Sequence, residues 1–194
     1  MSSYCDVAPG HQWHGPYHDT EYGFPLRSDA ELFERLILEI NQAGLSWLTI
    51  LKKREAFRAA YRGFDPAVVA RFGARDVRRL MADAGIIRNR LKIEAAIANA
   101  KTVLVLQKEY GALEGWLDES YFVDAKTQRR KDAKRARTRE EWVALFRKSF
   151  RFTGGEIVGE FLLSTGYLPG AHRKSCPVYS RILAANPPFL RRER

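Results

Sequence analysis

Long hydrophobic runs are absent from this 194-residue chain. No segment approaches the roughly 20 apolar residues that a membrane-spanning helix needs. The first ten residues also lack the basic flank and apolar stretch of a secretory signal peptide. We therefore expect a soluble, cytoplasmic protein with no membrane partner.

Cysteine is scarce as well, with only Cys5 and Cys176 in the chain. Two cysteines cannot build the disulfide framework of a small secreted domain, and in a reducing compartment we expect them to be inert or metal-bound. Internal repeats and Pro/Gly/Ser-rich linkers are also missing. A hydrophobic content of 45% is that of a globular protein rather than a disordered one. These features predict a single domain over residues 1–194.

Acidic residues number 23 against 33 basic ones, which gives a formal net charge of +10. Much of the excess lies in Lys126–Arg139, a segment that contains eight basic residues and a single acidic one, Asp132. Such a run is usually a solvated helix or a flexible insertion. The alternative is a strip that contacts phosphates and whose binding weakens with salt. Charge alone leaves both interpretations open.

The two-residue alternation of a half-buried strand is not sustained anywhere, and apolar residues instead recur three or four apart. This spacing predicts an all-α fold. Capping boxes of Ser28 with Glu31 and of Thr138 with Glu141 mark two helix starts. Further helices are expected from Asp65-Pro66 and over residues 90–109, 156–164 and 177–185.

Two close pairs of metal-ligating residues lie at opposite ends of the chain: Cys5 with His18, and His172 with Cys176. Two thiolates and two imidazoles make the tetrahedral ligand set of a closed structural zinc site. The first pair is spaced too widely for a zinc knuckle, and His11 and His14 are competing ligands. The alternative is that the cysteines lie near histidines without a metal.

Glu39 lies within about 60° of Leu32 and Leu36 on a helical wheel, so its carboxylate sits at the edge of an apolar face. Such an acid is either bonded to backbone amides or reserved for a ligand. Beyond it, residues 41–47 interrupt the helix and end in Trp47. Aromatic residues near one carboxylate can stack a cationic heterocycle, although they can equally form ordinary core.

A tight turn at residues 150–155 joins two expected helices and ends in Gly154-Gly155. Backbone N–H groups at such a helix start can hold a phosphate without reading a base, although Gly-Gly also simply joins helices in many proteins. A second, basic turn over residues 85–90 is a candidate for a neighbouring phosphate.

Several of these segments match one known family. The matching stretches are Tyr17-His18-Asp19 with Glu21 and Gly23, Glu39 with Gln42–Trp47, Leu51–Glu55, Phe64-Asp65-Pro66, Asp83–Arg88 and Phe150–Gly154. On these residues the chain resembles the bacterial 3-methyladenine DNA glycosylase I family of the helix-hairpin-helix superfamily. The resemblance covers roughly residues 1–105 and resumes at the hairpin.

The resemblance implies a DNA repair enzyme that flips 3-methyladenine out of alkylated double-stranded DNA and hydrolyses its N-glycosidic bond. It implies roles for four groups of residues. They are the catalytic Glu39; Tyr17, Trp47, Tyr22 and His14 around the base; Gly44, Leu45, Arg88, Arg90, Thr153, Gly154 and Gly155 on DNA; and Cys5, His18, His172 and Cys176 as ligands of one structural zinc ion.

The chain departs from the family pattern at several positions. His14 replaces a usual tyrosine, and Val7 and Tyr22 replace tryptophans, so the pocket can differ from the family's. The superfamily's usual catalytic aspartate has no counterpart in residues 166–172, and no hairpin lysine suits Schiff-base chemistry. We therefore expect a monofunctional enzyme without lyase activity.

Two other function classes stay open at this point. One is a DNA-binding module that recognises damage on the same scaffold without breaking the glycosidic bond. The other is a zinc-containing helical protein that does not bind DNA. No pattern in the sequence specifies an oligomeric state, and a monomer is the expectation.

Overall fold

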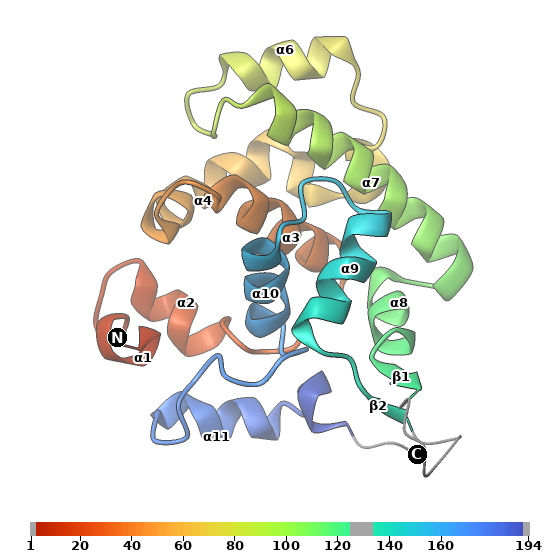
Figure 1. Ribbon diagram of the computed structural model, residues 1–194. Helices are drawn as coiled ribbons and strands as arrows, with labels where there is room; N and C mark the ends of the chain where they lie inside the picture. Colours follow the sequence, from red (N-terminus) through yellow and green to blue (C-terminus); the bar gives the residue numbers. More distant parts are fainter. Residues whose placement is uncertain (1–2, 125–133, 192–194) are drawn as a thin grey trace.

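The computed structural model describes residues 3–124 and 134–191, and these are almost entirely helical (Figure 1). The exception is an antiparallel ribbon of β1 (Phe122–Asp124) and β2 (Lys134–Ala136). The prediction of a helical fold is confirmed, but the ribbon was not expected. Strands of three residues are too short to show an alternating pattern.

The six helices that the sequence predicts lie where the apolar spacing and the caps place them. Both predicted capping boxes form, with Ser28 and Thr138 each accepting a backbone hydrogen bond at the start of a helix. In chain order the helical elements are α1 (Tyr4–Val7), α2 (His14–Thr20), α3 (Asp29–Gln42), α4 (Trp47–Ala60), η1 (Arg62–Phe64), α5 (Pro66–Val69), α6 (Ala74–Ala82), α7 (Arg90–Tyr110), α8 (Leu113–Glu119), α9 (Arg139–Ser149), α10 (Gly155–Ser164), α11 (Pro177–Ala184) and η2 (Pro188–Leu190). Of these, α1, α2, α4, α6 and α8 were not predicted.

Helix α3 is the centre of the fold, since it packs against α4, α7, α8 and α10. Every residue from Leu32 to Asn41 is buried, so α3 has no solvated face along this stretch. Charged side chains on such a helix need partners or a cavity, because an isolated buried charge is costly. Glu34 is paired with Arg54 and Arg58 of α4, and the surroundings of Arg35 and Glu39 are described below.

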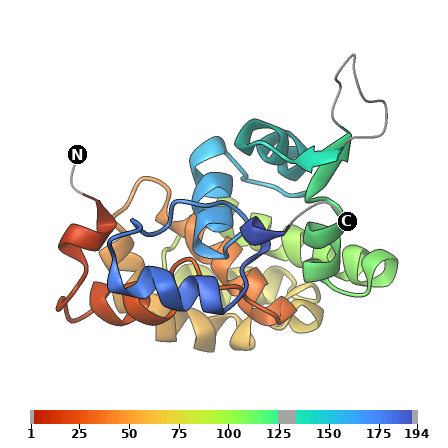
Figure 2. The same ribbon diagram turned by 90° about the horizontal axis from the view of Figure 1, so that it is seen from below.

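The two ends of the chain lie together. Figures 1 and 2 both show α11, near the C-terminus, beside α1 and α2. Cys5 of α1 packs in one small buried cluster with Cys176, Val178 and Ile182. None of the described helices is both long and apolar enough to cross a membrane.

Two loops matter for the site. The α3–α4 loop turns at Gly44, whose φ of +82° is a conformation that glycine adopts without strain. The α9–α10 loop is the expected hairpin between two packed helices, with Gly154 as the N-cap of α10. Both loops reach the same cavity.

Candidate functional site

A cavity of about 760 Å³ lies between the N-terminal helices, the end of α3, the start of α4 and the start of α10. Three glutamates contribute to its wall and, among the described residues, no lysine, arginine or histidine does. The ionisable groups of the wall other than tyrosine are therefore all acids. Its lining residues are Tyr4, Tyr17, Tyr22, Glu39, Gln42, Ala43, Gly44, Trp47, Gly154, Gly155, Glu156, Ile157 and Glu160.

Glu39 is 4% exposed, and what exposure it has is to this cavity. No described side chain or backbone amide donates a hydrogen bond to its carboxylate, so the interpretation as a helix-end residue bonded to main-chain donors is not supported. Burial raises the pKa of Glu39 to about 8. The positive charge of Arg35 opposes this shift and the negative charge of Glu160 adds to it. The pocket thus holds a carboxylate that gains from a cationic partner.

Aromatic rings form the wall beside Glu39. The ring centroids of Tyr17 and Trp47 are 5.2 Å apart, and those of Tyr17 and Tyr22 are 5.7 Å apart. A planar base held between two rings needs about 7 Å, because each contact takes about 3.5 Å. No base fits between Tyr17 and Trp47 in this arrangement, so stacking would use their cavity-facing sides.

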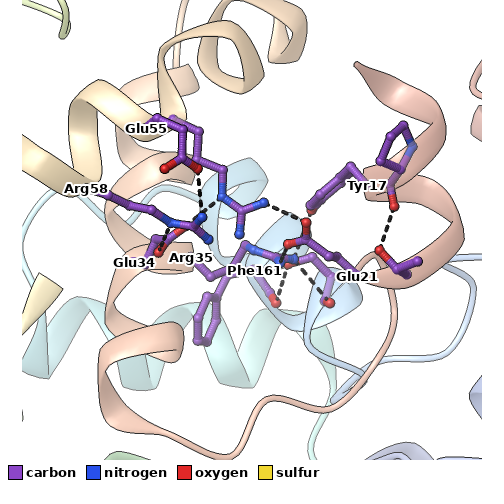
Figure 3. A network of polar contacts seen from close by, with 11 residues as sticks. Tyr17, Glu21, Glu34, Arg35, Glu55, Arg58 and Phe161 are labelled. Atoms are coloured by element: carbon purple, nitrogen blue, oxygen red, sulfur yellow. Dashed lines mark hydrogen bonds and ion pairs between the residues drawn. The ribbon is translucent and has the colours of Figure 1, made fainter. Parts of the chain in front are cut away.

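A buried ion-pair network fixes this wall (Figure 3). Arg35, 2% exposed, donates a hydrogen bond of 2.9 Å to the Tyr17 hydroxyl and another of 3.3 Å to the Ser164 carbonyl. It also pairs with Glu21, which in turn accepts from Arg54 of α4 at 2.7 Å. The network joins α2, α3, α4 and α10. It therefore orients Tyr17 relative to Glu39. The Glu21 carboxylate also compensates the buried positive charge of Arg35.

The residues predicted to contact DNA lie on two sides of the cavity mouth. Gly44 lines the cavity, and Leu45 beside it is 40% exposed. Gly154 and Gly155 line the other side, where the first turn of α10 leaves backbone N–H groups without helical partners. Thr153 is buried and donates to the Phe150 carbonyl, which shapes the hairpin.

The basic turn before α7 does not line the cavity, but it is close to the first of these loops. Arg88 and Arg90 are exposed. Lys92, two residues further on, donates hydrogen bonds to the carbonyls of Asn41 and Ala43 at 3.0 and 2.8 Å. The turn therefore lies beside the α3–α4 loop.

The structure brings together the four predicted metal ligands, Cys5, His18, His172 and Cys176, all of them buried, with their ligand atoms within 4.8 Å of one another. Three sulfur–nitrogen separations measure 3.6, 3.4 and 3.8 Å. A tetrahedral zinc site with ordinary bond lengths requires about 3.5 Å between such atoms. The donor set and its size therefore fit a metal ion. The competing ligands His11 and His14 are not part of the cluster.

Outer contacts hold the two imidazoles in place. Nδ1 of His18 lies 2.6 Å from an Asp19 carboxylate oxygen, and Nε2 of His172 lies 2.8 Å from the Tyr22 carbonyl. Each ring thus turns its other nitrogen toward the cluster, as metal-bound histidines do. The second contact connects the cluster to the pocket, because the Tyr22 ring lines the cavity.

Several residues of the site were not predicted, among them Tyr4, Arg35 and Glu160. His14, expected at the base, does not line the cavity and instead forms a 2.9 Å hydrogen bond with the Tyr4 hydroxyl. Glu160 could have been predicted in the same way as Glu39, because it is also an acid within an apolar helical stretch. Most of the basic run Lys126–Arg139, residues 126–133, lies outside the described residues.

Comparison with known proteins gives a consistent result. A sequence profile of the methyladenine glycosylase family matches residues 9–179. DNA-3-methyladenine glycosylase 1 of Escherichia coli (strain K12) is 38% identical over 174 residues, which are 84% of this chain and 89% of that protein. A solved structure of 3-methyladenine DNA glycosylase I from Staphylococcus aureus has a TM-score of 0.75 and 34% identity, and covers 90% of this chain and 95% of its own. Another, a variant of 3-methyladenine DNA glycosylase I in complex with 3-methyladenine, has a TM-score of 0.74 and 32% identity, with coverage of 90% and 96%.

Proposed function

The chain belongs to the methyladenine glycosylase family and removes 3-methyladenine from DNA, and we propose that the cavity beside Glu39 receives the damaged base. The observation that carries this proposal is a buried carboxylate without a hydrogen-bond donor in an aromatic-walled cavity of about 760 Å³. Methylation at N3 gives adenine a positive charge, which this carboxylate can neutralise. Normal adenine is neutral and better stacked in the duplex, so it gains less from entering.

In this proposal the base turns out of the duplex and lies against the cavity-facing sides of Tyr17 and Trp47. Glu39 accepts hydrogen bonds from its edge. A cationic ring gains additional attraction from aromatic faces. The same charge makes the base a good leaving group, so little acid catalysis is required.

Double-stranded DNA would bind across the cavity mouth. Gly44 and Leu45 would occupy the gap left by the everted base, and the backbone amides at Thr153–Gly155 would grip a phosphate beside it. Arg88 and Arg90 are placed to contact a further phosphate. One chain carries all of these elements, which is consistent with action as a monomer.

Hydrolysis without lyase activity follows from the lining of the cavity. A β-lyase needs an amine that can attack the sugar and form a Schiff base. No described lysine lines the cavity, so water is the nucleophile that we propose.

The Cys5, His18, His172 and Cys176 cluster would hold one zinc ion with a structural role. All four positions of a tetrahedral ion would be taken by protein, which leaves none for a substrate or water. When bound, the ion stabilises the fold by joining the two ends of the chain.

The test is release of free base from methylated duplex DNA. Wild-type protein should liberate 3-methyladenine, and Glu39→Gln should do so at least tenfold more slowly, with Glu119→Gln on the surface of α8 as the matched control. Equal release by Glu39→Gln and wild type would remove Glu39 from the mechanism. Binding of the damaged duplex by wild type without any base release would favour the non-catalytic DNA-binding alternative.

A further inference from the structure

A second carboxylate, that of Glu160, lines the same cavity as Glu39 and is not assigned a role by the proposed function. It lies on α10, whereas Glu39 lies on α3, so the two acids come from different helices. The negative charge of Glu160 contributes to the raised pKa of Glu39, which places the two carboxylates within electrostatic reach of each other.

Glu160 is held in place on one side only. The Tyr22 hydroxyl donates a hydrogen bond of 3.2 Å to its Oε2 atom. Nothing else in the part of the chain that the structure describes donates to this carboxylate, and no lysine or arginine forms an ion pair with it. Its second oxygen, Oε1, is therefore available to a ligand in the cavity.

The depth of Glu160 distinguishes it from Glu39. Glu39 is 4% exposed, whereas Glu160 is only partly buried. Along α10 the cavity wall begins with Gly155 and reaches Glu160 five residues later, about 7.5 Å further along the helix axis. Glu160 is thus set back from the hairpin at the mouth and is less buried than Glu39, so its burial along the wall is intermediate.

The phosphate, deoxyribose and base of an everted nucleotide would lie along the cavity in the same order, from the mouth inward. The phosphate stays at the hairpin, the base enters the deepest part of the cavity, and the deoxyribose lies between the two. A wall residue of intermediate burial is therefore placed to face the sugar.

We propose that Glu160 is a second catalytic carboxylate, which faces the deoxyribose, stabilises the positive charge that develops at C1′ and accepts a proton from the water that adds there. This inference rests on the proposed function, since it assigns the sugar side of a site whose base side is formed by Glu39.

The step balances as follows. The bond between C1′ and N9 breaks and its electron pair goes to the base, which leaves as neutral 3-methyladenine. Water adds to C1′, and Glu160 takes one of its protons and passes it to solvent. The products are the free base, an abasic deoxyribose with a hydroxyl at C1′, and one proton.

Three groups around Glu160 shift its pKa, namely Tyr22 after α2, Arg139 on α9 and Glu156 on its own helix, and Glu39 on α3 also faces it from across the cavity. Burial raises the pKa of Glu160, and the Glu156 charge also raises it, while the Tyr22 hydrogen bond and the Arg139 charge lower it. A carboxylate that binds protons more strongly than usual is better matched to the task of a general base.

The test separates chemistry from base binding in the full-length protein. Glu160→Gln keeps the shape and can still accept the Tyr22 hydrogen bond. We expect its single-turnover rate on 3-methyladenine in duplex DNA to fall at least about 100-fold. Its Kd for free 3-methyladenine should stay within threefold of wild type, whereas Glu39→Gln should weaken that Kd. Glu119→Gln, which removes the same charge from an exposed site on α8, should match wild type in both assays.

Chemical rescue provides the second readout. In Glu160→Ala, added sodium formate should restore part of the lost rate, because formate can occupy the vacated carboxylate position, and sodium chloride at equal ionic strength should not. A Glu160→Gln rate within threefold of wild type, a parallel loss of base binding, or a Glu160→Ala rate that formate leaves unchanged would each overturn the inference. Absence of base release by wild type would instead contradict the proposed function.

Discussion

Lys92 and Asn99 lie seven residues apart on one face of α7, and each holds the backbone of one of the two loops at the cavity mouth. Lys92 Nζ donates to the carbonyls of Asn41 and Ala43 before the Gly44 turn. Asn99 donates to the Arg151 carbonyl at 3.1 Å and accepts from the Arg151 N–H at 2.7 Å. Seven residues are two helical turns, about 10 Å. Helix α7 therefore sets the spacing between the loop that would enter the duplex and the hairpin that would grip a phosphate.

Replacing Asn99 should detach the hairpin from this helix. Asn99 is fully buried, and Asn99→Ala leaves an N–H and a carbonyl of the hairpin without their partners, which costs about 2–4 kcal/mol of stability. We expect affinity for duplex DNA to fall about tenfold while the Kd for free 3-methyladenine is unchanged. Urea denaturation measures the loss of stability, and titrations with duplex DNA and with free 3-methyladenine measure the two affinities. Val105→Ala, at an exposed position of the same helix, is the control, and equal losses for DNA and base would refute the argument.

Replacing Lys92 should affect the other loop. The buried Lys92→Met substitution removes the donor that orders residues 41–43, so Gly44 and Leu45 lose their fixed position. We expect single-turnover excision from duplex DNA to fall about tenfold, with less than a threefold change in binding of free base. Lys101→Met removes an equal charge from an exposed site on α7 and should behave as wild type. A Lys92→Met rate equal to that of wild type and Lys101→Met would show that the hydrogen bonds of Lys92 do not position this loop.

Glu39 should make stability depend on pH. Its folded pKa of about 8 is raised above the ordinary value of 4.5, so folding favours the protonated form. Its contribution is most favourable below about pH 4.5 and is lost as the pH rises through about 8. Glu39→Gln removes this dependence. The free energy of unfolding of the variant, relative to wild type, should therefore increase by about 2–4 kcal/mol between pH 5 and pH 8.

Urea denaturation at several pH values measures that difference. Glu119→Gln should follow the wild-type curve, because its carboxylate is exposed. Parallel curves for wild type and Glu39→Gln would mean that the Glu39 pKa is not raised.

The metal cluster predicts one zinc ion per chain. Cys176→Ser should reduce the bound zinc to a small fraction and lower the Tm by about 10 °C, since a structural ion contributes several kcal/mol to folding. Elemental analysis and thermal denaturation measure the two effects. His11→Ala should keep its zinc, because His11 lies outside the cluster. Purified wild-type protein without bound metal, and without a Tm shift on chelation, would rule out the structural role.

The local parts of this fold were largely predictable from the sequence. Ser28, Thr138 and Asp65 mark helix starts through hydrogen bonds that span only a few residues, so a short window of sequence contains the whole interaction. The Cys5, His18, His172 and Cys176 cluster was predicted because such cysteine and histidine pairs suit a metal, and the family resemblance favoured this interpretation over cysteines that lie near histidines without one. Glu39 was found because an acid on an apolar helical face needs an explanation.

The long-range parts were not predictable in the same way. Arg35 orients Tyr17 across 18 positions of sequence, and the Tyr22 hydroxyl reaches Glu160 across 138. Neither pair leaves a periodic signal, because its spacing depends on how the helices pack. For the same reason, the contact of His14 with Tyr4 could not be distinguished from a contact with the base.

The cluster of Cys5, His18, His172 and Cys176 also has a consequence for biosynthesis. Two of its sulfur–nitrogen contacts connect positions 167 and 158 residues apart, so the second pair of ligands is synthesised long after the first. The His172 ring also contacts the carbonyl of Tyr22, a residue of the pocket wall. A nascent polypeptide that does not yet contain His172 and Cys176 therefore lacks the contacts that hold this side of the pocket. We therefore expect damage recognition to begin only after the synthesis of these two ligands.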